Sequence, residues 1–333
     1  MAVSVKDVAA AAAVSVGTVS NVLNRPDKVS PDTVARVHEV IERLGFVRND
    51  AARQLRAGRS RSIGLIVLDS ANPFFAEVAR GAEERAAERG VSVLLGNSDQ
   101  DAHRENAYLD LFREQRVNGV LLSPRALDDG RAAMLASAGL PVVLVDAELP
   151  GAALSSVAVD DVEGGHLAVA HLLERGRRRI AFVGPPAIRQ VADRLEGARR
   201  ALAGTLGATL EVVPSDGLTI LHGRAAGESI ASLSPSVRPD AVFCANDLLA
   251  VGVLQGAAIL GGLRVPEDLA LVGYDDIEYA QSTVVPLSSV RQPARAIGAA
   301  AVDALFDRLD DPDGAPRRVR FRPELVIRAS TAG

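Results

Sequence analysis

From Ile63 onward the sequence alternates between short apolar runs and longer amphipathic segments, and this alternation restricts its fold more than any other feature. The apolar runs are rich in Val and Leu and predict nine strands, at 63–68, 91–96, 119–124, 141–146, 156–160, 180–184, 210–214, 241–246 and 269–276. Amphipathic helices are predicted between most of them, including 75–89, 102–116, 162–175, 192–203 and 247–260. Fully apolar strands that alternate with helices indicate parallel sheets covered on both faces.

The alternating region is long for a single sheet and divides near Asp160. We therefore predict two similar doubly wound lobes. Open α/β sheets bind ligands beyond the carboxyl ends of their strands, so a ligand cleft is expected where the strand ends of the two lobes face each other.

The N-terminal segment has a different texture and predicts three short helices. The first is the Ala-rich stretch 5–14, and the second is 16–24 with Ser15 as its N-cap. The third follows Ser30 as N-cap and stops at Gly45. Three short helices with a tight turn between the first two are typical of a helix-turn-helix module.

Charge is distributed unevenly along the chain. The whole chain carries a net charge of −5, whereas residues 1–60 contain nine Lys or Arg and six acids, an excess of three positive charges. A basic N-terminal part on an acidic body is expected when one end of a protein meets a polyanion. The stretch 49–62 links the two parts, and its short helix-forming half is predicted to form only when something supports it.

Several classes of protein are disfavoured by what the sequence lacks. No apolar run approaches the length of a membrane span, and the N-terminus has no secretory layout, so we expect a cytoplasmic protein without a membrane partner. The single cysteine, Cys244, excludes an intrachain disulfide framework and a multi-cysteine metal cage. No metal and no cofactor are predicted.

Catalysis is also disfavoured, although doubly wound folds often belong to enzymes. The sequence has no dinucleotide-binding G-x-G-x-x-G at the first strand, no P-loop and no G-x-S-x-G elbow. Its five His residues do not cluster with Cys or carboxylates at metal-ligand spacing. Asp275 and Asp276 are adjacent and point differently, which is wrong for a catalytic carboxylate pair. We predict no enzyme and no catalytic residue.

The order and spacing of several segments resemble those of the LacI/GalR family of bacterial repressors over essentially the whole chain. The segments are VKDVAAAAAVSVGTVSNVLN, VSPDTVARVHEVIERLGF, AARQLRAGRSRSIGLIV, NPFFAEVARGAE, EQRVNGVLLSP, AVDD, FCANDLLAVGVL and LVGYDDIEYA. The resemblance implies an all-α helix-turn-helix head and a periplasmic-binding-protein-like α/β body of two doubly wound parallel-sheet lobes. The implied divisions are a DNA-binding domain at 1–48, a hinge helix and linker at 49–61, and an effector-binding and dimerisation domain at 62–333. Within that domain, the first lobe is expected at about 62–159 and 291–318, and the second at about 160–290 and 319–333.

The second helix of the head carries most of the residues expected to read DNA. It is uncharged, and small polar side chains let its backbone approach a duplex and donate to phosphates or base edges. The resemblance places sequence specificity on Val16, Gly17 and Asn21: Val16 could contact a thymine methyl, and Asn21 could pair with adenine. The alternative is an ordinary polar helix. The predicted DNA contacts in the head are Ser4, Ser15, Val16, Gly17, Thr18, Ser20, Asn21, Asn24 and Ser30.

The linker carries a second set of predicted DNA contacts. By resemblance, two hinge helices, one from each subunit, pair in the minor groove, and Leu55 from each is inserted as a wedge that kinks the duplex. Asn49, Ala52 and Arg56 are expected to contact DNA nearby. The alternative is that Leu55 only tethers the linker to the body.

The body is expected to bind a small molecule through side chains that follow its strands. Arg194, Asn246 and Asp275 match effector-contacting positions of the family, and an Arg, an Asn and an Asp suit the hydroxyls of a sugar. Asn246 and Asp275 could instead cap the helices that follow them. The predicted effector contacts are Phe74, Phe75, Asp146, Gln190, Arg194, Asn246 and Asp275. Asp146 could serve the effector or the lobe interface.

These features together predict a homodimeric transcription regulator, a repressor that a small sugar releases from a pseudo-palindromic operator. Some relatives carry an aromatic side chain at the position of Leu218, against which a ligand ring can stack. This chain has Leu there, so a flat purine ligand is less expected. After FRPELVIRAS no heptad extension follows, which favours a dimer. Two alternatives stay open: a regulator of the same family that needs a corepressor, and a sugar-binding protein without a role at DNA.

Overall fold

The computed structural model describes residues 3–46, 60–126, 130–149, 151 and 153–332. The chain forms two compact units, the head at 1–60 and the body at 61–333.

The head is a bundle of short helices around a small apolar core. Its elements are α1 (Val5–Ala11), α2 (Val16–Asn24), the 3₁₀ turn η1 (Pro26–Lys28) and α3 (Pro31–Leu44). The buried core consists of Val and Ala side chains from the three helices, including Val8, Val19 and Val37. Such small side chains let short helices pack closely, and this packing supplies the stability that helices of this length lack alone.

The helix boundaries of the head follow local signals, with two differences from the sequence-based expectation. Helix α2 begins after Ser15 as predicted, and the Ser15 hydroxyl oxygen accepts a hydrogen bond from the Thr18 amide at 3.0 Å. Helix α1 ends at Ala11, short of residue 14, because Ala13 adopts a left-handed backbone conformation. Ser30 precedes α3, but its hydroxyl donates to the Thr33 hydroxyl at 2.9 Å and does not cap the backbone.

The first lobe of the body is built on a six-stranded parallel sheet of order β11-β5-β4-β3-β1-β2 in the described residues. The strands are β1 (Ser62–Val67), β2 (Ser92–Asn97), β3 (Val120–Leu122), β4 (Val142–Val145), β5 (Ser155–Val159) and β11 (Arg318–Phe321). The helices are α5 (Pro73–Glu88), α6 (Ala102–Glu114), α7 (Arg131–Ser137) and α13 (Ala294–Asp310). One buried cluster joins α5 and α13 to one face of the sheet, and another joins α6 and α7 to the other face, so the parallel strands are covered on both sides.

The second lobe repeats this plan with the order β12-β10-β9-β8-β6-β7, in which β12 pairs antiparallel with β10 and the other described pairings are parallel. The strands are β6 (Arg179–Val183), β7 (Thr209–Val213), β8 (Ala241–Cys244), β9 (Ala270–Asp275), β10 (Ser288–Arg291) and β12 (Glu324–Val326). The helices are α8 (Asp161–Glu174), α9 (Arg189–Leu202), α10 (Ile220–Ser232), α11 (Asp247–Val253) with its π-helical continuation η2 (Leu254–Leu260), and α12 (Glu278–Ser282).

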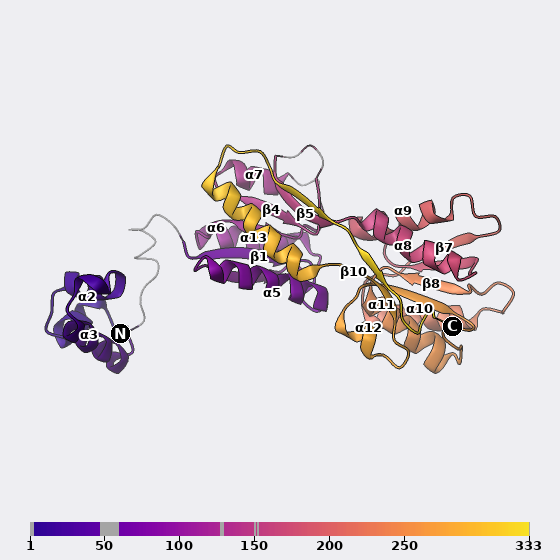
Figure 1. The fold of residues 1–333 in the computed structure, drawn as a ribbon, viewed down its shortest axis with the longest axis horizontal. Helices are drawn as coiled ribbons and strands as arrows, with labels where there is room; N and C mark the ends of the chain where they lie inside the picture. Colours follow the sequence, from indigo (N-terminus) through magenta and orange to yellow (C-terminus); the bar gives the residue numbers. More distant parts are fainter. Residues whose placement is uncertain (1–2, 47–59, 127–129, 150, 152, 333) are drawn as a thin grey trace. The chain divides into compact units, whose positions relative to one another are not determined.

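The chain passes between the lobes after β5, after β10 and after β11 (Figure 1). All nine predicted apolar runs overlap a strand of one of the two sheets, with bounds that differ by a few residues, while β10, β11 and β12 come from segments that are not apolar throughout. Strand β11 pairs with β5, so the sheet of the first lobe includes residues up to Phe321. The two lobes touch through Leu248 and Ile277 of the second lobe, which belong to the same buried cluster as Phe74 and Phe75 of the first.

Candidate effector cleft and DNA-reading helix

A cavity of about 310 Å³ lies between the two lobes of the body. Loops that follow strands of both sheets contribute to its walls, as expected for facing α/β lobes. The seven predicted effector residues all line this cavity, namely Phe74, Phe75, Asp146, Gln190, Arg194, Asn246 and Asp275. The structure therefore brings together side chains that lie up to two hundred positions apart in the sequence.

Arg194 extends from α9 into the cleft and is held from three sides. Its Nε donates to Asp161 Oδ1 at 2.8 Å, and its Nη1 donates to the Ala245 carbonyl at 2.7 Å. The guanidinium also lies over the Tyr274 ring, 3.7 Å from the centroid. Burial alone would lower the pKa of Arg194, but nearby carboxylates, Asp161 foremost, raise it above its ordinary value. Arg194 is therefore a fixed cation with its planar face and one edge committed to the protein.

Close packing of α8 on α9 sets the position of Arg194. A Cβ on Gly165 of α8 would collide with the Arg194 carbonyl, so glycine permits this approach. The same approach brings Asp161, the first residue of α8, to the guanidinium. The pair is buried on both sides, with side-chain exposures of 6% for Arg194 and 9% for Asp161.

Asp275 ends β9 and faces the first lobe. Its Oδ2 accepts a hydrogen bond from Asn72 Nδ2 at 3.0 Å, and its Oδ1 accepts one from Gln292 Nε2 at 2.7 Å. Burial raises the pKa of the Asp275 carboxyl, and Arg194 offsets part of the increase. Helix α12 begins only after Ile277. Asp275 therefore does not cap it, and its carboxylate joins the two lobes across the cleft.

Asn246 follows β8 and does cap the next helix. Its Oδ1 accepts from the Leu249 amide at 2.9 Å at the start of α11, and its Nδ2 donates to the Leu218 carbonyl at 3.1 Å. The side chain lines the cavity with both of its polar atoms already engaged. The capping alternative considered from the sequence is thus realised for Asn246.

Asp146 and Gln190 form a second connection between the lobes. Gln190 Nε2 donates to the Asp146 carbonyl at 2.9 Å and lies 3.3 Å from Asp146 Oδ2. Burial, followed by the charge of Asp161, raises the pKa of Asp146 well above its ordinary value. Within the described residues, Asp146 Oδ1 is buried without a hydrogen-bond partner. Both roles considered for Asp146, lobe interface and cavity lining, are compatible with this position.

Phe74 and Phe75 supply an apolar wall of the cavity. They lie in the first turn of α5, whose N-cap Asn72 accepts from the Phe74 amide at 3.0 Å through its Oδ1. The two rings meet edge to face, with centroids 5.1 Å apart. Aliphatic side chains such as Ile188 and Leu218 also line the cavity.

The cavity also contains polar side chains that the sequence-based set lacks. Asn72 and Gln292 hold Asp275, and Arg125 and Asp69 stand at the wall. Gln292 follows β10 directly, so the expectation of polar groups after strands would have included it had the Ser-containing run 288–291 been recognised as a strand. Asn72 occupies the N-cap position before a Pro at the helix start, which is a readable local signal.

The head presents a small, uncharged surface on α2. Val16, Gly17 and Asn21 are exposed, and Val16 has 42% of its surface accessible. Among the described residues the Asn21 side chain forms no hydrogen bond or ion pair. Val19 and Val22 on the opposite side of the helix are buried in the core. Helix α2 therefore packs against the core of the head with one face, and the three residues of predicted specificity are exposed on the other face.

The remaining predicted contacts in the head are hydroxyl and amide groups near helix ends. The Thr18 hydroxyl lies 2.9 Å from the Ser15 hydroxyl, and Asn24 Nδ2 donates to the Ser20 carbonyl at 2.7 Å. Ser4 and Asp7 form a capping box at the start of α1. A hydroxyl that caps a helix can still donate to a phosphate, so these bonds are compatible with DNA contact.

The charge of the N-terminal region is concentrated outside the described head. Residues 1–46 contain five basic and five acidic side chains, whereas 47–59 contain four Arg and one Asp. The predicted contacts Asn49, Ala52, Leu55 and Arg56 belong to that stretch and lie outside the described residues. The positive excess expected to meet DNA therefore belongs to the linker sequence and not to the helix-turn-helix itself.

The described residues hold neither a metal-binding cluster nor a membrane-spanning helix. No group of three or more His, Cys, Asp or Glu side chains there is arranged to hold a metal ion. No helix in the same part of the chain has the length and apolar character needed to cross a membrane.

The fold and the site define a class of protein: a helix-turn-helix head joined to a two-lobed binding body with a ligand-sized cleft between its lobes. Comparison with known families agrees with both parts. Residues 4–49 match the model of bacterial regulatory proteins of the lacI family, and residues 169–331 match the periplasmic binding protein-like domain.

Individual relatives match the whole chain. It is 34% identical to the HTH-type transcriptional repressor PurR of Aliivibrio fischeri strain MJ11, over 98% of each chain. It is also 34% identical to the ribose operon repressor of Escherichia coli K12, over 98% of this chain and 99% of the relative. A structure of the lac repressor dimer bound to operator and the anti-inducer ONPF is 27% identical, with a TM-score of 0.84 over the full length of both chains. The chain belongs to the LacI family of transcriptional regulators, and it is a DNA-binding repressor and not an enzyme.

Proposed function

We propose that a small neutral sugar binds in the cleft and releases this repressor from a pseudo-palindromic operator. The observation that carries the proposal is the chemistry of the unsatisfied atoms in the cavity wall. Among the described residues, Asp146 Oδ1 and Gln292 Oε1 are buried there without a hydrogen-bond partner, and both are acceptors. A ligand rich in hydroxyl donors satisfies such atoms, and burying them unsatisfied is costly.

The charge of the cleft favours a neutral ligand over an anionic one. Three buried carboxylates, those of Asp146, Asp161 and Asp275, surround the buried guanidinium of Arg194. Arg194 is already paired with Asp161, so a phosphate or carboxylate on the ligand would meet uncompensated negative charge. We therefore expect free sugars to bind and their phosphorylated or oxidised forms to be rejected.

The shape of the wall favours a sugar over a flat heterocycle. Phe74 and Phe75 form an edge-to-face pair on one side, and Leu218 stands where a second aromatic platform would be needed to stack a purine. A sugar ring can lie against one aromatic wall while its hydroxyls reach the polar atoms. A corepressor with donor groups is the competing ligand class, and equal identity to a PurR and to a ribose operon repressor does not separate the two.

A second copy of the chain is the proposed partner of the body. Exposed large apolar side chains occur on β2 and α6 of the first lobe and on contiguous helices of the second, namely Leu94, Leu95, Leu111, Leu221, Ile259, Leu260 and Tyr279. Single exposed apolar residues are ordinary, but sets on both lobes are typical of an interface. The related lac repressor structure is a dimer. Two-fold symmetry of a dimer would set the symmetry of the operator.

The proposed mechanism couples the cleft to DNA through the lobes. In a dimer each α2 reads one half-site, and the 49–57 segments fold and pair on DNA with Leu55 at the central base step. A sugar that changes the relative position of the first lobes separates those segments and lowers operator affinity. Linkage then requires operator DNA to weaken sugar binding by the same factor.

The experiment is selection of bound duplexes from random DNA by the purified full chain, with and without a pool of free sugars. Enrichment of one inverted repeat that is lost with sugars supports the proposal. Enrichment that appears only with added purines or other small molecules would replace it by the corepressor mechanism. A variant lacking residues 1–60 should keep sugar binding and lose DNA binding, and DNA binding by that variant would contradict the role of the head.

A further inference from the structure

The turn that follows β9 has an unusual backbone. Asp275 and Asp276 are consecutive residues with φ angles of 100° and 54°. Residues other than glycine seldom adopt φ angles in this range. Two such residues in succession persist only when their surroundings fix them. The turn also carries Asp275 into the cleft, so whatever fixes it determines where an effector-facing carboxylate lies.

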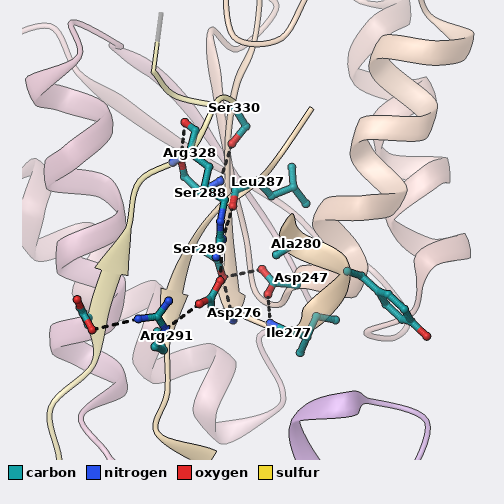
Figure 2. Close-up of polar contacts among 12 residues, drawn as sticks. Asp247, Asp276, Ile277, Ala280, Leu287, Ser288, Ser289, Arg291, Arg328 and Ser330 are labelled. Carbon is teal, nitrogen blue, oxygen red and sulfur yellow. Dashed lines mark hydrogen bonds and ion pairs between the residues drawn. The ribbon is translucent and has the colours of Figure 1, made fainter. Parts of the chain in front are cut away.

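Buried hydrogen bonds hold this turn from behind (Figure 2). The Asp276 amide donates to the Ser289 hydroxyl at 3.0 Å, and the next amide, of Ile277, donates to Asp247 Oδ2 at 2.9 Å. The Ser289 hydroxyl in turn donates to Asp247 Oδ1 at 2.7 Å. We name Asp247, Ser289, Asp276 and Ile277 the turn brace. It closes a cycle between the start of α11, the crossover strand β10 and the turn.

The carboxylate of Asp276 is anchored as well. Its Oδ2 accepts a hydrogen bond from Arg291 Nε at 2.8 Å, and its Oδ1 forms an ion pair with Arg328 Nη1 at 2.7 Å (Figure 2). Strand β10 and the C-terminal segment therefore both bind the side chain. The Asp276 side chain is only 5% exposed. The turn is therefore fixed through its backbone and its side chain together.

The burial of the Asp247 carboxyl group is energetically unfavourable, unlike the burial of an apolar side chain at the same place. It is fully buried, and among the described residues no cation pairs with it. A Cβ at Gly273 of β9 would collide with its Oδ1, so the strand is kept bare where the carboxylate lies. Burial, and then the charge of Asp275, raise the pKa of Asp247 well above its ordinary value. A buried carboxyl with only neutral partners points to a specific role.

Three residues of this network are next to a cavity residue in the sequence. Asp247 follows Asn246, Asp276 follows Asp275, and Arg291 precedes Gln292. Ile277, held by Asp247, packs in the buried cluster that contains Phe74 and Phe75 of the first lobe. The network thus holds three cavity side chains and one interlobe contact in a fixed relation.

We propose that Asp247 and Ser289 are positioning residues for effector binding, which hold the Asp275–Ile277 turn so that Asp275 faces the ligand. The proposal rests on the proposed function in that it takes the cavity as the effector site. Neither residue lines the cavity, so each acts through the turn and not by touching the ligand.

Strand β10 offers a matched control. Ser288 and Ser289 are neighbours, and both are fully buried. The Ser288 hydroxyl lies 2.6 Å from the Thr331 hydroxyl, on the side of the C-terminal segment. It also accepts from the Arg328 amide at 2.8 Å (Figure 2). Ser288→Ala should therefore lower stability without releasing the turn, whereas Ser289→Ala removes the acceptor of the Asp276 amide. Asp247→Asn is a second test, because its amide group cannot accept from both former donors.

The experiment compares these three variants with the wild type as full chains. Amide hydrogen exchange of Asp276 and Ile277 without ligand reports the turn, and calorimetric titration with D-ribose reports the cleft. Ser289→Ala and Asp247→Asn should raise the exchange rate of at least one of these amides tenfold or more and weaken D-ribose binding about tenfold. Ser288→Ala should change both by less than twofold at a comparable loss of melting temperature.

The possible failures are distinguishable. Equal exchange at the turn in Ser288→Ala and Ser289→Ala would overturn the brace, whatever ligand the protein takes. Faster exchange in Ser289→Ala with undiminished D-ribose affinity would overturn the positioning role. A wild type that does not bind D-ribose while the exchange difference stands would exclude D-ribose as the effector and support the brace.

Discussion

The DNA-reading helix and the effector cleft place their predicted functional groups in opposite surroundings. On α2, Val16 and Asn21 are exposed and uncharged, and the residues that hold the helix lie on its other face. In the cleft, Arg194 and Asp275 are buried, charged and bonded to other protein groups. The side chains predicted to function and the side chains that stabilise the fold are therefore separate in the head and the same in the cleft. Substitutions should reveal this difference directly.

The largest effect is expected for Arg194→Ala. It removes the partner of Asp161 and leaves a buried carboxylate unpaired, which costs about 3–5 kcal/mol of the free energy of unfolding. The sugar response should be lost at the same time. Denaturant unfolding measures the first effect, and operator binding titrated with sugar measures the second.

A double variant separates the two consequences. Arg194→Ala with Asp161→Asn removes the unpaired charge, so it should recover part of the stability while the sugar response stays absent. If Arg194→Ala kept wild-type stability, or if the double variant regained the sugar response, Arg194 would not join structure and function as inferred.

The next effect belongs to the head. Asn21→Ala should cost about 1–3 kcal/mol of operator binding, the value of a bidentate contact to a base edge, and relax specificity at one base pair of each half-site. Its melting temperature should stay that of the wild type, because the side chain is exposed and forms no hydrogen bond or ion pair in the described head. Competition between the selected operator and single-base variants measures the loss. An equal loss of affinity for all DNA sequences would indicate that Asn21 contacts the phosphate backbone of the DNA and not a base edge.

Asp146→Asn should raise the stability of the fold, whereas Arg194→Ala should lower it. The folded state raises the pKa of Asp146, so the ionised carboxylate destabilises the fold above that raised pKa. This cost disappears as pH falls through the folded pKa toward the ordinary value near 3.8. The neutral Asn should therefore stabilise the ligand-free chain at neutral pH by about 1 kcal/mol, a typical desolvation penalty. The advantage should shrink as pH is lowered.

Thermal unfolding of both proteins between pH 8 and pH 5 tests this sign. A variant that is less stable than the wild type at neutral pH would show that Asp146 is stabilised by its partners and not strained by burial. Sugar affinity should fall in the variant even where stability rises, which sharpens the contrast with α2.

The head and the cleft also differ in how much of their structure could be predicted from the sequence. In the head, Ser15 as a cap and Gly45 as a stop are local signals, and they predicted the bounds of α2 and the end of α3. The apolar runs of the body likewise predicted the central strands. Strands β10 and β11 were not predicted, because β10 begins with two Ser and β11 alternates Arg with apolar residues.

The cleft could be predicted only in part. The expectation of polar groups after strands found Asp146, Asn246 and Asp275, because that signal is local to each strand. It could not show that Asn72 would meet Asp275 from 203 positions away, or that both polar atoms of Asn246 would be used within the second lobe. The Asn72–Asp275 bond depends on how the two lobes face each other, and the Asn246–Leu218 bond depends on how segments of the second lobe that are 28 positions apart meet. No local pattern encodes either arrangement.

The smallest expected effect is that of Val16→Ala, and Val19→Ala is its control in the same helix. Val16 is 42% exposed and Val19 is fully buried. Loss of two methyl groups at Val16 should lower operator affinity by less than about 1 kcal/mol, at thymine-containing positions only, and leave unfolding unchanged. The same deletion at Val19 should lower stability by about 2 kcal/mol through lost burial and a residual cavity. If both variants lost stability and affinity together, α2 would not separate its packing face from its reading face, and the contrast with the cleft would fail.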